Sequence, residues 1–521
     1  MDRTTSLKRI LDNRGAWDIA VIGGGATGMG IAVDAASRGY SVVLLEQSDF
    51  GKGTSSRSTK LVHGGVRYLQ QGNISLVMEA LKERGILLQN APHLVRNLPF
   101  VVPNYQWWEA PFYGVGLKAY DLLAGKYGFG RSRLLSRGEV LERIPTLEQE
   151  GLRGGVLYYD GQFDDSRLLI HLAMTASDHG ACLINYAPVT RVRKDAEGLV
   201  CGVEFRDEER GEEHAVAARC VINATGPFAD RLRLQDDPAA ERLIAPSQGV
   251  HLVLDRSFLP GDTAIMVPHT RDGRVMFAIP WHGHAVVGTT DTPIAEATLE
   301  PTPLDGEIEF ILETASAYLA RPPQRGDVLS AFTGIRPLVD ARSGSSTASL
   351  SRDHTLSISK SGLLSIVGGK WTTYRKMAED CVDHALLLGH LEERPCRTAT
   401  LPIHGAQLET NRNGPFSVYG SDAGSIERII REQPSLAGPL DSMLPVCGAQ
   451  VIWAVRAEMA RSVEDVLARR TRALFLNARS AQAMAPAVAR FMARELNRDS
   501  AWEQRQLAAF DEVARAFTVD K

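Results

Sequence analysis

Cysteine is scarce and scattered in this sequence. The chain of 521 residues holds six cysteines, and none of them forms a C-x-x-C pair. Zinc sites and iron–sulfur clusters need clustered thiolates, and a disulfide framework needs closely spaced cysteines, so the sequence argues against all three. We therefore expect no metal site, and a reducing compartment fits best.

Long apolar runs and an excess of charge are also absent. The first segment, residues 1–17, is polar, and no apolar run approaches the roughly 18 residues of a membrane-spanning helix. With 58 Lys and Arg against 62 Asp and Glu, the formal net charge is -4, which favours no nucleic-acid partner. We expect neither a signal peptide nor an integral membrane protein. The 44% hydrophobic residues suffice for two or three domains.

The sequence does contain a dinucleotide-binding pattern near its N-terminus. Gly23, Gly25 and Gly28 form G-x-G-x-x-G between the apolar run 19–22 and a segment free of turn residues, which indicates strand, tight turn and helix. Gly25 leaves space for a pyrophosphate at the helix N-terminus. Glu46 follows at the end of a second predicted strand, where its carboxylate can accept ribose hydroxyls. This pattern alone leaves NAD and FAD open.

A segment rich in small and hydroxyl residues comes next, from Gly51 to Lys60. Its hydroxyls and backbone N–H groups suit a second phosphate or an isoalloxazine ring, although a solvated loop has the same composition. The tripeptide His63-Gly64-Gly65 is typical of backbone that approaches a flat ligand.

The rest of the chain predicts the domain organisation. A strand over 217–223 ends in Ala-Thr-Gly and returns the chain to the cofactor domain, which is therefore discontinuous. The run 246–292 alternates like an antiparallel sheet, and helical stripes follow residue 398. We predict an α/β fold. Its parts are a Rossmann-like cofactor-binding domain (18–90, 155–230, 330–395), an inserted antiparallel-sheet substrate domain (91–154, 231–329) and a C-terminal helical domain (399–521).

A series of motifs runs through nearly the whole chain in one order. They are residues 21–28, 54–60, 63–68, 223–227, 279–281 with 288–291, 334–337, 368–375 and 469–472. Together they resemble the FAD-dependent glycerol-3-phosphate dehydrogenases that feed electrons to a respiratory quinone. One departure is Gln248, where some members carry a lysine.

The resemblance implies a Rossmann-like domain that binds FAD, and no tethering His or Cys motif is evident, so we expect the cofactor to be non-covalent. The residues predicted to contact it are Gly23, Gly25, Ala26, Thr27, Gly28, Glu46, Gln47, Thr54, Ser55, Ser56, Ser58, Thr59, Lys60, His63, Gly64, Gly65, Val189, Ala224, Thr225, Gly226, Gly369, Lys370 and Thr372.

The implied substrate is sn-glycerol 3-phosphate, whose phosphate dianion needs guanidinium forks in a dry pocket. Arg67, Arg336 and Arg352 are the candidates, and Tyr68 adds a hydroxyl donor. We expect Arg336 in a rigid turn between glycine and proline. Lys370 would place a positive charge near the flavin or the phosphate.

The implied reaction gives dihydroxyacetone phosphate by hydride transfer from substrate C2 to flavin N5, while a base removes the C2 hydroxyl proton. Histidine suits that task near neutral pH. His251, expected at the start of a strand, is the first candidate, and His63 is the alternative. Arg336 and Lys370 complete the predicted catalytic set.

The electrons need an external acceptor, because the sequence shows one dinucleotide fingerprint, no clustered cysteines and no haem motif. The resemblance implies a membrane quinone, and hence a cytoplasmic protein bound peripherally to the inner face of the cytoplasmic membrane. The sequence leaves the oligomeric state open, and a homodimer is one option. Its aromatic and basic stretch 107–133 suits the bilayer interface, but such aromatics are also ordinary core residues.

Three other functions fit the sequence. They are a soluble oxidase that uses oxygen, a related FAD amine or 2-hydroxyacid oxidoreductase, and a flavin-containing binding protein without turnover. The arginine-bearing motifs favour a phosphate substrate over an amino acid.

Overall fold

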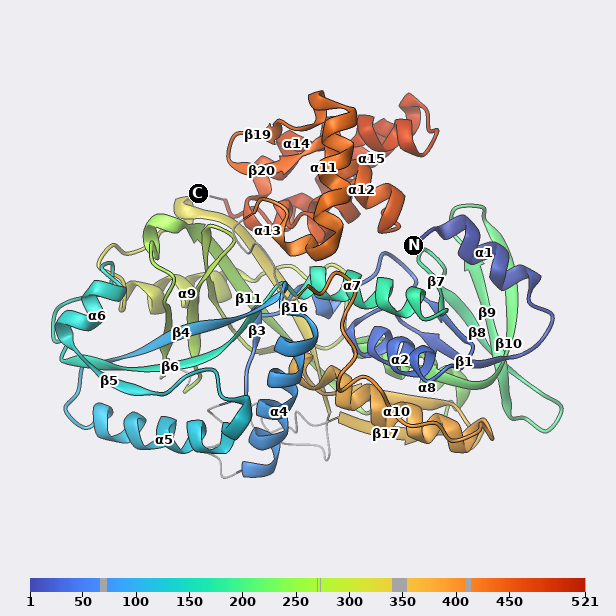
Figure 1. Ribbon diagram of the computed structural model, residues 1–521, viewed down its shortest axis with the longest axis horizontal. Helices are drawn as coiled ribbons and strands as arrows, with labels where there is room; N and C mark the ends of the chain where they lie inside the picture. Colours follow the sequence, from blue (N-terminus) through green and yellow to red (C-terminus); the bar gives the residue numbers. More distant parts are fainter. Residues whose placement is uncertain (66–72, 269, 272, 340–353, 408–413, 521) are drawn as a thin grey trace.

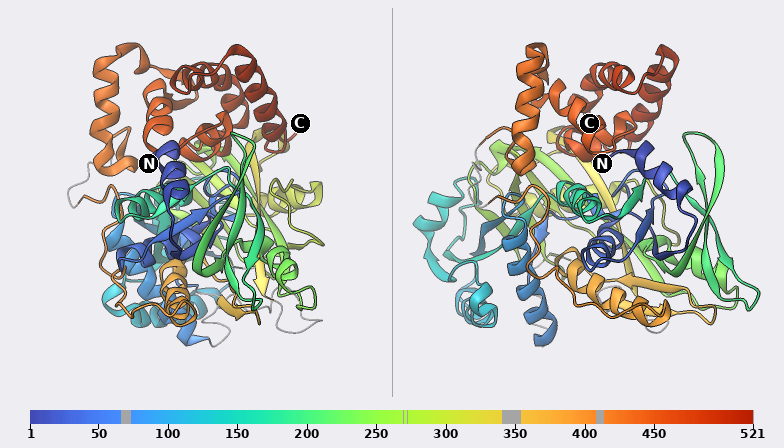
Figure 2. Two further views of the ribbon diagram at one scale, coloured as in Figure 1. Left: turned by 90° about the vertical axis from the view of Figure 1, so that its right-hand side faces the viewer. Right: turned by 45° about the vertical axis from the view of Figure 1, so that its right-hand side comes forward.

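The computed structural model describes residues 1–65, 73–268, 270–271, 273–339, 354–407 and 414–520. Of the predicted site residues, Arg67, Tyr68 and Arg352 lie outside this set. Two large sheets lie side by side, and a layer of helices from the C-terminal part of the chain covers their junction (Figures 1 and 2).

The first sheet has eight strands and carries the predicted cofactor fingerprint. Its main path runs β17-β18-β10-β1-β2-β7, and β8 and β9 extend from β10. The bounds are β1 (Trp17–Ile22), β2 (Val42–Leu45), β7 (Cys182–Ile184), β8 (Val189–Lys194), β9 (Val200–Asp207), β10 (Glu212–Asn223), β17 (His354–Ile358) and β18 (Leu364–Gly368). The parallel pairing of β1 with β10 places Ile22 opposite Asn223. The glycine turn after β1 and the Ala-Thr-Gly turn after β10 therefore meet at one edge of the sheet.

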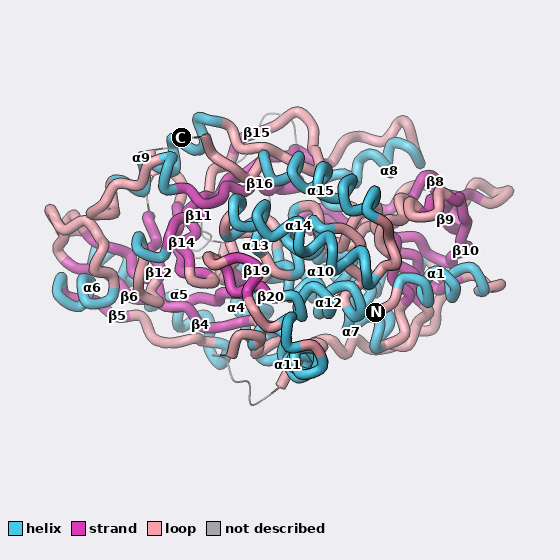
Figure 3. Tube along the Cα trace, turned by 90° about the horizontal axis from the view of Figure 1, so that it is seen from above, coloured by secondary structure: helices cyan, strands magenta, loops and turns pink. Residues whose placement is uncertain are grey.

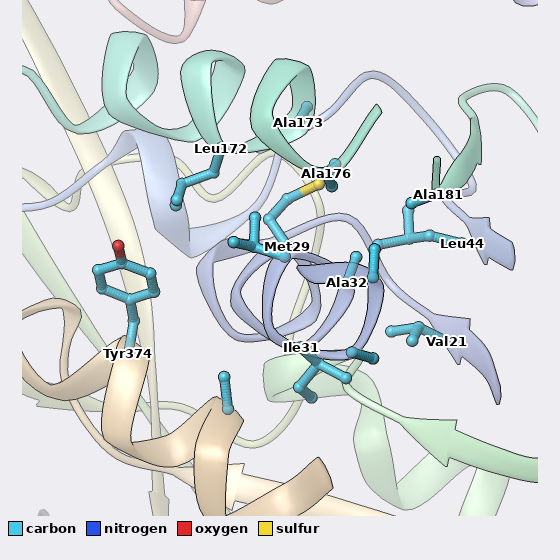
Figure 4. Close-up of a cluster of buried hydrophobic side chains, with 14 of the residues drawn as sticks. Val21, Met29, Ile31, Ala32, Leu44, Leu172, Ala173, Ala176, Ala181 and Tyr374 are labelled. Carbon is cyan, nitrogen blue, oxygen red and sulfur yellow. The ribbon is translucent and has the colours of Figure 1, made fainter. Parts of the chain in front are cut away.

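Helix α2 (Ala26–Ser37) packs between α7 (Asp165–Asp178) and α10 (Tyr374–Leu388). Figure 4 shows Met29 and Ala32 of α2 in this cluster, with Leu172 and Ala173 of α7 nearby. The small residues of α2 permit this close approach, since a Cβ at Gly30 would lie 2.9 Å from the Tyr374 ring. The predicted strand, turn and helix are thus confirmed and firmly buried.

The second sheet has ten strands in the order β15-β11-β14-β13-β12-β4-β6-β3, with β16 beside β11 and β5 beside β6. The bounds are β3 (Leu61–Val62), β4 (Val95–Asn104), β5 (Arg133–Ser136), β6 (Gly154–Phe163), β11 (Ile244–Asp255), β12 (Ala264–Val267), β13 (Met276–Trp281), β14 (His284–Gly288), β15 (Thr292–Pro293) and β16 (Val328–Val339). The antiparallel sheet predicted for 246–292 is confirmed by the pairing of β11, β13 and β14. The domain limits themselves stay a prediction; β6 and β16, assigned to the cofactor domain, pair within this second sheet.

Two local expectations are wrong. Arg336 lies inside β16 rather than in a turn, because β16 pairs with β11 from Ile244↔Val339 to Val253↔Ser330. Pairing with a distant strand outweighs the turn preference of a Gly-x-x-Pro sequence. His251 lies in the interior of β11 rather than at its start, because the ladder to β16 extends well before it.

The C-terminal part is mostly helical and packs above the two sheets, as Figure 3 shows from above. It contains α11 (Ala423–Glu432), α12 (Gly448–Ala457), the π-helical segment η9 (Asp465–Arg470), α13 (Ala473–Leu476), α14 (Ala478–Glu495), α15 (Ser500–Arg515) and the hairpin of β19 (Pro439–Asp441) and β20 (Leu444–Cys447). Its apolar residues share one core with the second sheet, where Leu474 and Phe475 join Phe332 and Trp281. The predicted fold class is confirmed.

The other helices lie around the sheets: α1 (Arg3–Asp12), α4 (Ile74–Asn90), α5 (Glu109–Ala124), α6 (Arg137–Arg143), α8 (Ala229–Asp236) and α9 (Asp305–Ser316). Within the described residues, no helix has the length and apolar character needed to cross a bilayer. The same part of the chain holds no group of three or more His, Cys, Asp or Glu placed to bind a metal ion.

Candidate active site

A cavity of about 340 Å³ opens where β1, β2 and β10 end. Many of the residues predicted to contact the cofactor line it: Gly23, Gly25, Ala26, Thr27, Glu46, Gln47, Thr54, Ser55, Val189, Ala224, Thr225, Gly226, Gly369 and Lys370. They come from segments far apart in the sequence, so the sheet topology brings together what the motifs only suggested. Cavities of this size hold small ligands and cofactors.

Glycine is needed at the three fingerprint positions for different physical reasons. A Cβ at Gly25 would meet only Ser55 Oγ, at 3.1 Å, and would otherwise project into the cavity. Gly23 has a φ of 106°, and a Cβ at Gly28 would lie 1.9 Å from the Gly23 carbonyl oxygen. Gly25 therefore keeps space for a ligand, whereas Gly23 and Gly28 permit the fold itself. Gly28 does not line the cavity.

Glu46 lies on the wall at the end of β2. Its Oε2 accepts a hydrogen bond from Gly24 N at 2.6 Å, and its Oε1 accepts one from Ser48 N at 2.9 Å. Burial raises the pKa of this carboxyl, and the two backbone donors oppose the shift. A carboxylate on the wall, a glycine without Cβ and the N-terminus of α2 together fit a dinucleotide.

A second cluster centres on His251 of β11. Its Nε2 lies 2.9 Å from Thr59 Oγ1, and its ring stacks on Phe332 with centroids 4.9 Å apart and planes 13° apart. The ring is only 3% exposed, and Nδ1 has no hydrogen-bond partner among the described residues. Burial, followed by the charges of Lys60 and Arg336, holds the pKa of His251 well below its usual value. Burial and these charges therefore favour the neutral form of the imidazole, the form that a general base needs.

Arg336 shares this cluster. Its guanidinium donates to Asp291 Oδ1 at 3.2 Å, to Thr289 Oγ1 at 3.0 Å and to the Thr290 carbonyl oxygen at 2.9 Å. The side chain is 24% exposed and crosses Gly249, where a Cβ would lie 2.4 Å from Nη2. The guanidinium is thus held in one place while part of it still faces outward.

Hydrogen bonds connect the cavity wall to neighbouring parts of the site. Thr54 Oγ1, on the wall, donates to the Ile335 carbonyl oxygen at 2.6 Å, next to Arg336. Trp371 Nε1, also on the wall, donates to the Ser55 carbonyl oxygen at 2.8 Å. The wall and the strand of Arg336 therefore hold each other in position.

His63 and Gly64 lie apart from the wall. His63 N donates to Thr372 Oγ1 at 3.2 Å, and Gly64 N donates to Tyr120 OH at 2.8 Å. A Cβ at Gly64 would lie 2.4 Å from that hydroxyl. Close packing against Tyr120 thus explains why residue 64 is a glycine. The contact of Gly64 with a flat ligand stays a prediction.

Lys60 is fully buried and does not line the cavity. Its Nζ lies 2.7 Å from Asp165 Oδ2 and over the rings of Trp281, Phe332 and Phe475, at 5.3, 4.7 and 5.3 Å. Burial lowers the pKa of Lys60 to about 7, against the opposing effect of Asp165. The other predicted contacts that do not line the cavity are Ser56, Ser58, Thr59, Gly65 and Thr372. For all of them the cofactor contact stays a prediction.

The cavity also contains residues that the motifs did not single out. Lys52, Phe228, Arg231, Leu299 and Met377 all line it. Lys52 stands in the small-residue segment after the fingerprint, which was a usable signal. Arg231 and Leu299 come from segments without any motif, and only the fold reveals them.

Two family models cover most of the chain. A model of FAD-dependent oxidoreductases matches residues 18–375, and one for the C-terminal domain of alpha-glycerophosphate oxidase matches residues 396–503. A probable mitochondrial glycerol-3-phosphate dehydrogenase from Caenorhabditis elegans is 42% identical over 96% of this chain and 73% of its own length. The mitochondrial glycerol-3-phosphate dehydrogenase of Homo sapiens is 41% identical over 97% of this chain and 74% of its own length.

Solved structures agree with these matches. The glycerol-3-phosphate dehydrogenase from Bacillus halodurans, complexed with FAD, is 31% identical with a TM-score of 0.81, covering 99% of this chain and 98% of that one. L-alpha-Glycerophosphate oxidase from Mycoplasma pneumoniae, with FAD bound, shares the fold at 16% identity and a TM-score of 0.56, covering 74% of this chain and 98% of its own. The cofactor is FAD, and the chain belongs to the family of FAD-dependent glycerol-3-phosphate dehydrogenases.

Proposed function

We propose that this protein oxidises sn-glycerol 3-phosphate to dihydroxyacetone phosphate while bound peripherally to the cytoplasmic face of a membrane, and passes the electrons to a quinone. When bound, FAD supplies the hydride acceptor for substrate C2. His251 takes the proton of the C2 hydroxyl, and Arg336 binds the phosphate dianion. The proposal for these two side chains rests on their proximity, on the buried, neutral imidazole and on the outward-facing guanidinium.

The proposed membrane contact rests on an apolar surface formed by helices α4 and α5 and the turn just before α5, called here the α4–α5 surface. Its members are Ile74, Met78, Trp107, Trp108, Phe112, Val115 and Leu122, all at least 40% exposed. The opposite face of α5 is also apolar, because Tyr113, Leu117 and Tyr120 are buried. Core packing thus accounts for only one face of this helix.

Exposed apolar side chains in such number on neighbouring helices suit a bilayer interface. In Figure 1, α5 lies along the lower edge of the molecule and α4 runs from the middle of the molecule down to that edge, on the side away from the C-terminal helices. Lys118, Lys126 and Arg131 are exposed nearby and suit anionic lipid, while Arg133 pairs with Glu139 at 2.7 Å. A quinone dissolved in the bilayer would be within reach of a protein seated on this surface.

The test uses the FAD-loaded protein and liposomes of anionic lipid. We expect the double variant Phe112→Ser/Val115→Ser to lose most liposome binding, and to reduce a long-chain quinone in those liposomes slowly. Its anaerobic flavin reduction by glycerol 3-phosphate should match the wild type, because neither side chain touches the site. Met443→Ser is the matched control, since Met443 is 60% exposed at the β19–β20 hairpin on the opposite side.

Three outcomes would contradict parts of the proposal. Equal liposome binding by wild type and double variant would remove the α4–α5 surface from membrane contact. Brisk oxygen reduction by a wild type that ignores liposomes would favour a soluble oxidase instead. A yellow protein that glycerol 3-phosphate fails to bleach anaerobically would contradict the substrate assignment.

A further inference from the structure

The loop Asp49–Arg57 forms one wall of the cofactor cavity. Five consecutive residues of this loop, 51–55, line the cavity. Asp49 and Lys52 of the loop pair with charged side chains of the C-terminal helical part, whereas the Arg57 guanidinium pairs with Glu300 Oε2 at 2.6 Å. The contacts are spread along the loop from its first residue to its last.

The first attachment is Asp49. Its carboxylate accepts hydrogen bonds from Arg470 Nη1 at 2.7 Å and Nη2 at 2.8 Å, and a further one from Arg469 Nε. All three side chains are at most 2% exposed. The two arginines hold the pKa of Asp49 low, at about 2, against the effect of burial. A buried carboxylate left without these partners would be strongly destabilised.

The second attachment is Lys52, which lines the cavity. Its Nζ lies 2.8 Å from Glu464 Oε2 in the helical part and 3.3 Å from Glu300 Oε1 in the loop between β15 and α9. Arg469 Nη1 donates to the other oxygen of Glu464 at 2.6 Å. Glu464 therefore fixes the lysine and is itself fixed by the arginine that binds Asp49.

The third attachment lies at the far end of the loop. Arg472 Nη2 donates to the Ser56 carbonyl oxygen at 2.7 Å, and the Arg57 guanidinium lies 5.6 Å from the centroid of the Phe517 ring. The Phe517 side chain is apolar and only 2% exposed, so it contributes packing. Helical segments from residue 464 to 517 thus hold the wall at its beginning, middle and end.

We propose that the C-terminal helical part retains the FAD, with Glu464 as a positioning residue that holds Lys52 against the cavity. Without this clamp the loop would lose the partners of its buried charges and could move away from the cofactor. The inference goes beyond the proposed function, since it concerns retention of FAD and not the substrate or the electron acceptor.

The test measures release of FAD from the holoenzyme, read as the rise of free-flavin fluorescence after dilution. We expect Glu464→Gln and Lys52→Met each to release FAD about tenfold faster than wild type. A tenfold change corresponds to about 1.4 kcal/mol, which is the contribution of one charge-assisted hydrogen bond. The double variant should release it no faster than the quicker single variant, because both changes break the same contact. Glu495→Gln is the matched control. It removes a carboxylate bound to Arg456 at 2.6 Å within the helical part, and among the described residues no hydrogen bond or ion pair joins either of these two side chains to the loop.

Release from Glu464→Gln no faster than from Glu495→Gln would overturn the proposal, and so would multiplicative effects in the double variant. If Glu464→Gln fails to fold, Phe517→Leu decides instead: we expect faster release there too, and unchanged release would overturn the clamp. Because the readout needs neither substrate nor quinone, its failure is distinct from failure of the proposed reaction.

Discussion

His404 provides a test of how the FAD-binding part and the helical part are held together. Its Nδ1 lies 2.6 Å from Asp178 at the end of α7, and its Nε2 lies 3.0 Å from Asp422 just before α11. The hydrogen bond to Asp422 is the main cause that raises the pKa of His404 to about 9, Asp178 adds to it, and burial opposes it. We expect His404→Gln to remove a pH-dependent part of the stability.

The size of this contribution to the stability follows from the raised pKa of His404. A rise from an ordinary value of about 6.5 to about 9 corresponds to about 3 kcal/mol. Asp178 is 57% exposed, so solvent screening reduces this contribution to about 1 to 2 kcal/mol. Since the folded-state pKa is raised, the contribution is fully present below about pH 6.5 and is lost as the pH rises through about 9.

Urea denaturation followed by tryptophan fluorescence is the suitable assay. By the usual entropy per residue, a change of this size would move the melting temperature of so long a chain by only about 1 to 2 °C. We expect the wild type to lose about 1 to 2 kcal/mol more than His404→Gln between about pH 6 and pH 10. His384→Gln, at an exposed histidine of α10, should behave as the wild type. Equal losses in wild type and His404→Gln would refute the reasoning.

Three further predictions concern the site. Gly25→Val should fold normally but contain no FAD, because the new side chain projects into the cavity; normal flavin absorbance would contradict it. Gly249→Ala should displace the Arg336 guanidinium and raise the KM for glycerol 3-phosphate about tenfold at unchanged FAD content, and an unchanged KM would remove Arg336 from substrate binding. Phe332→Leu should slow anaerobic flavin reduction about two- to tenfold by loss of the ring stacked on His251, measured by stopped flow, and a normal rate would show that the stack does not position the imidazole.

Local patterns in the sequence predicted the parts of the fold that depend on local contacts. The glycine fingerprint gave the strand, turn and helix correctly because its geometry is confined to a few neighbouring residues. Helix caps are equally local, since the Asp164 side chain caps α7 by accepting a hydrogen bond from Arg167 N at 3.0 Å. Asn73 caps α4 in the same way.

Contacts between distant segments could not be read from the pattern. The turn expected at Arg336 fails because its strand pairs with β11, almost ninety residues earlier, as the pairing with Ser247 shows. Lys60 stands in a motif that predicts a cofactor contact, and the pattern gave no sign of its observed partner Asp165, which lies 105 residues away in the sequence. A motif specifies which residues matter more readily than which way they face.

The clamp on the cofactor loop has a consequence for how the protein is made. Asp49 leaves the ribosome 421 residues before Arg470. At about 5 to 20 residues per second, this delay is about 20 to 80 s. Throughout that time the carboxylate lacks the guanidinium that permits its burial, so the loop cannot take up its final position. Synthesis of the helical part therefore sets the earliest moment at which a nascent chain can hold its flavin firmly, and chains truncated before residue 464 should emerge colourless.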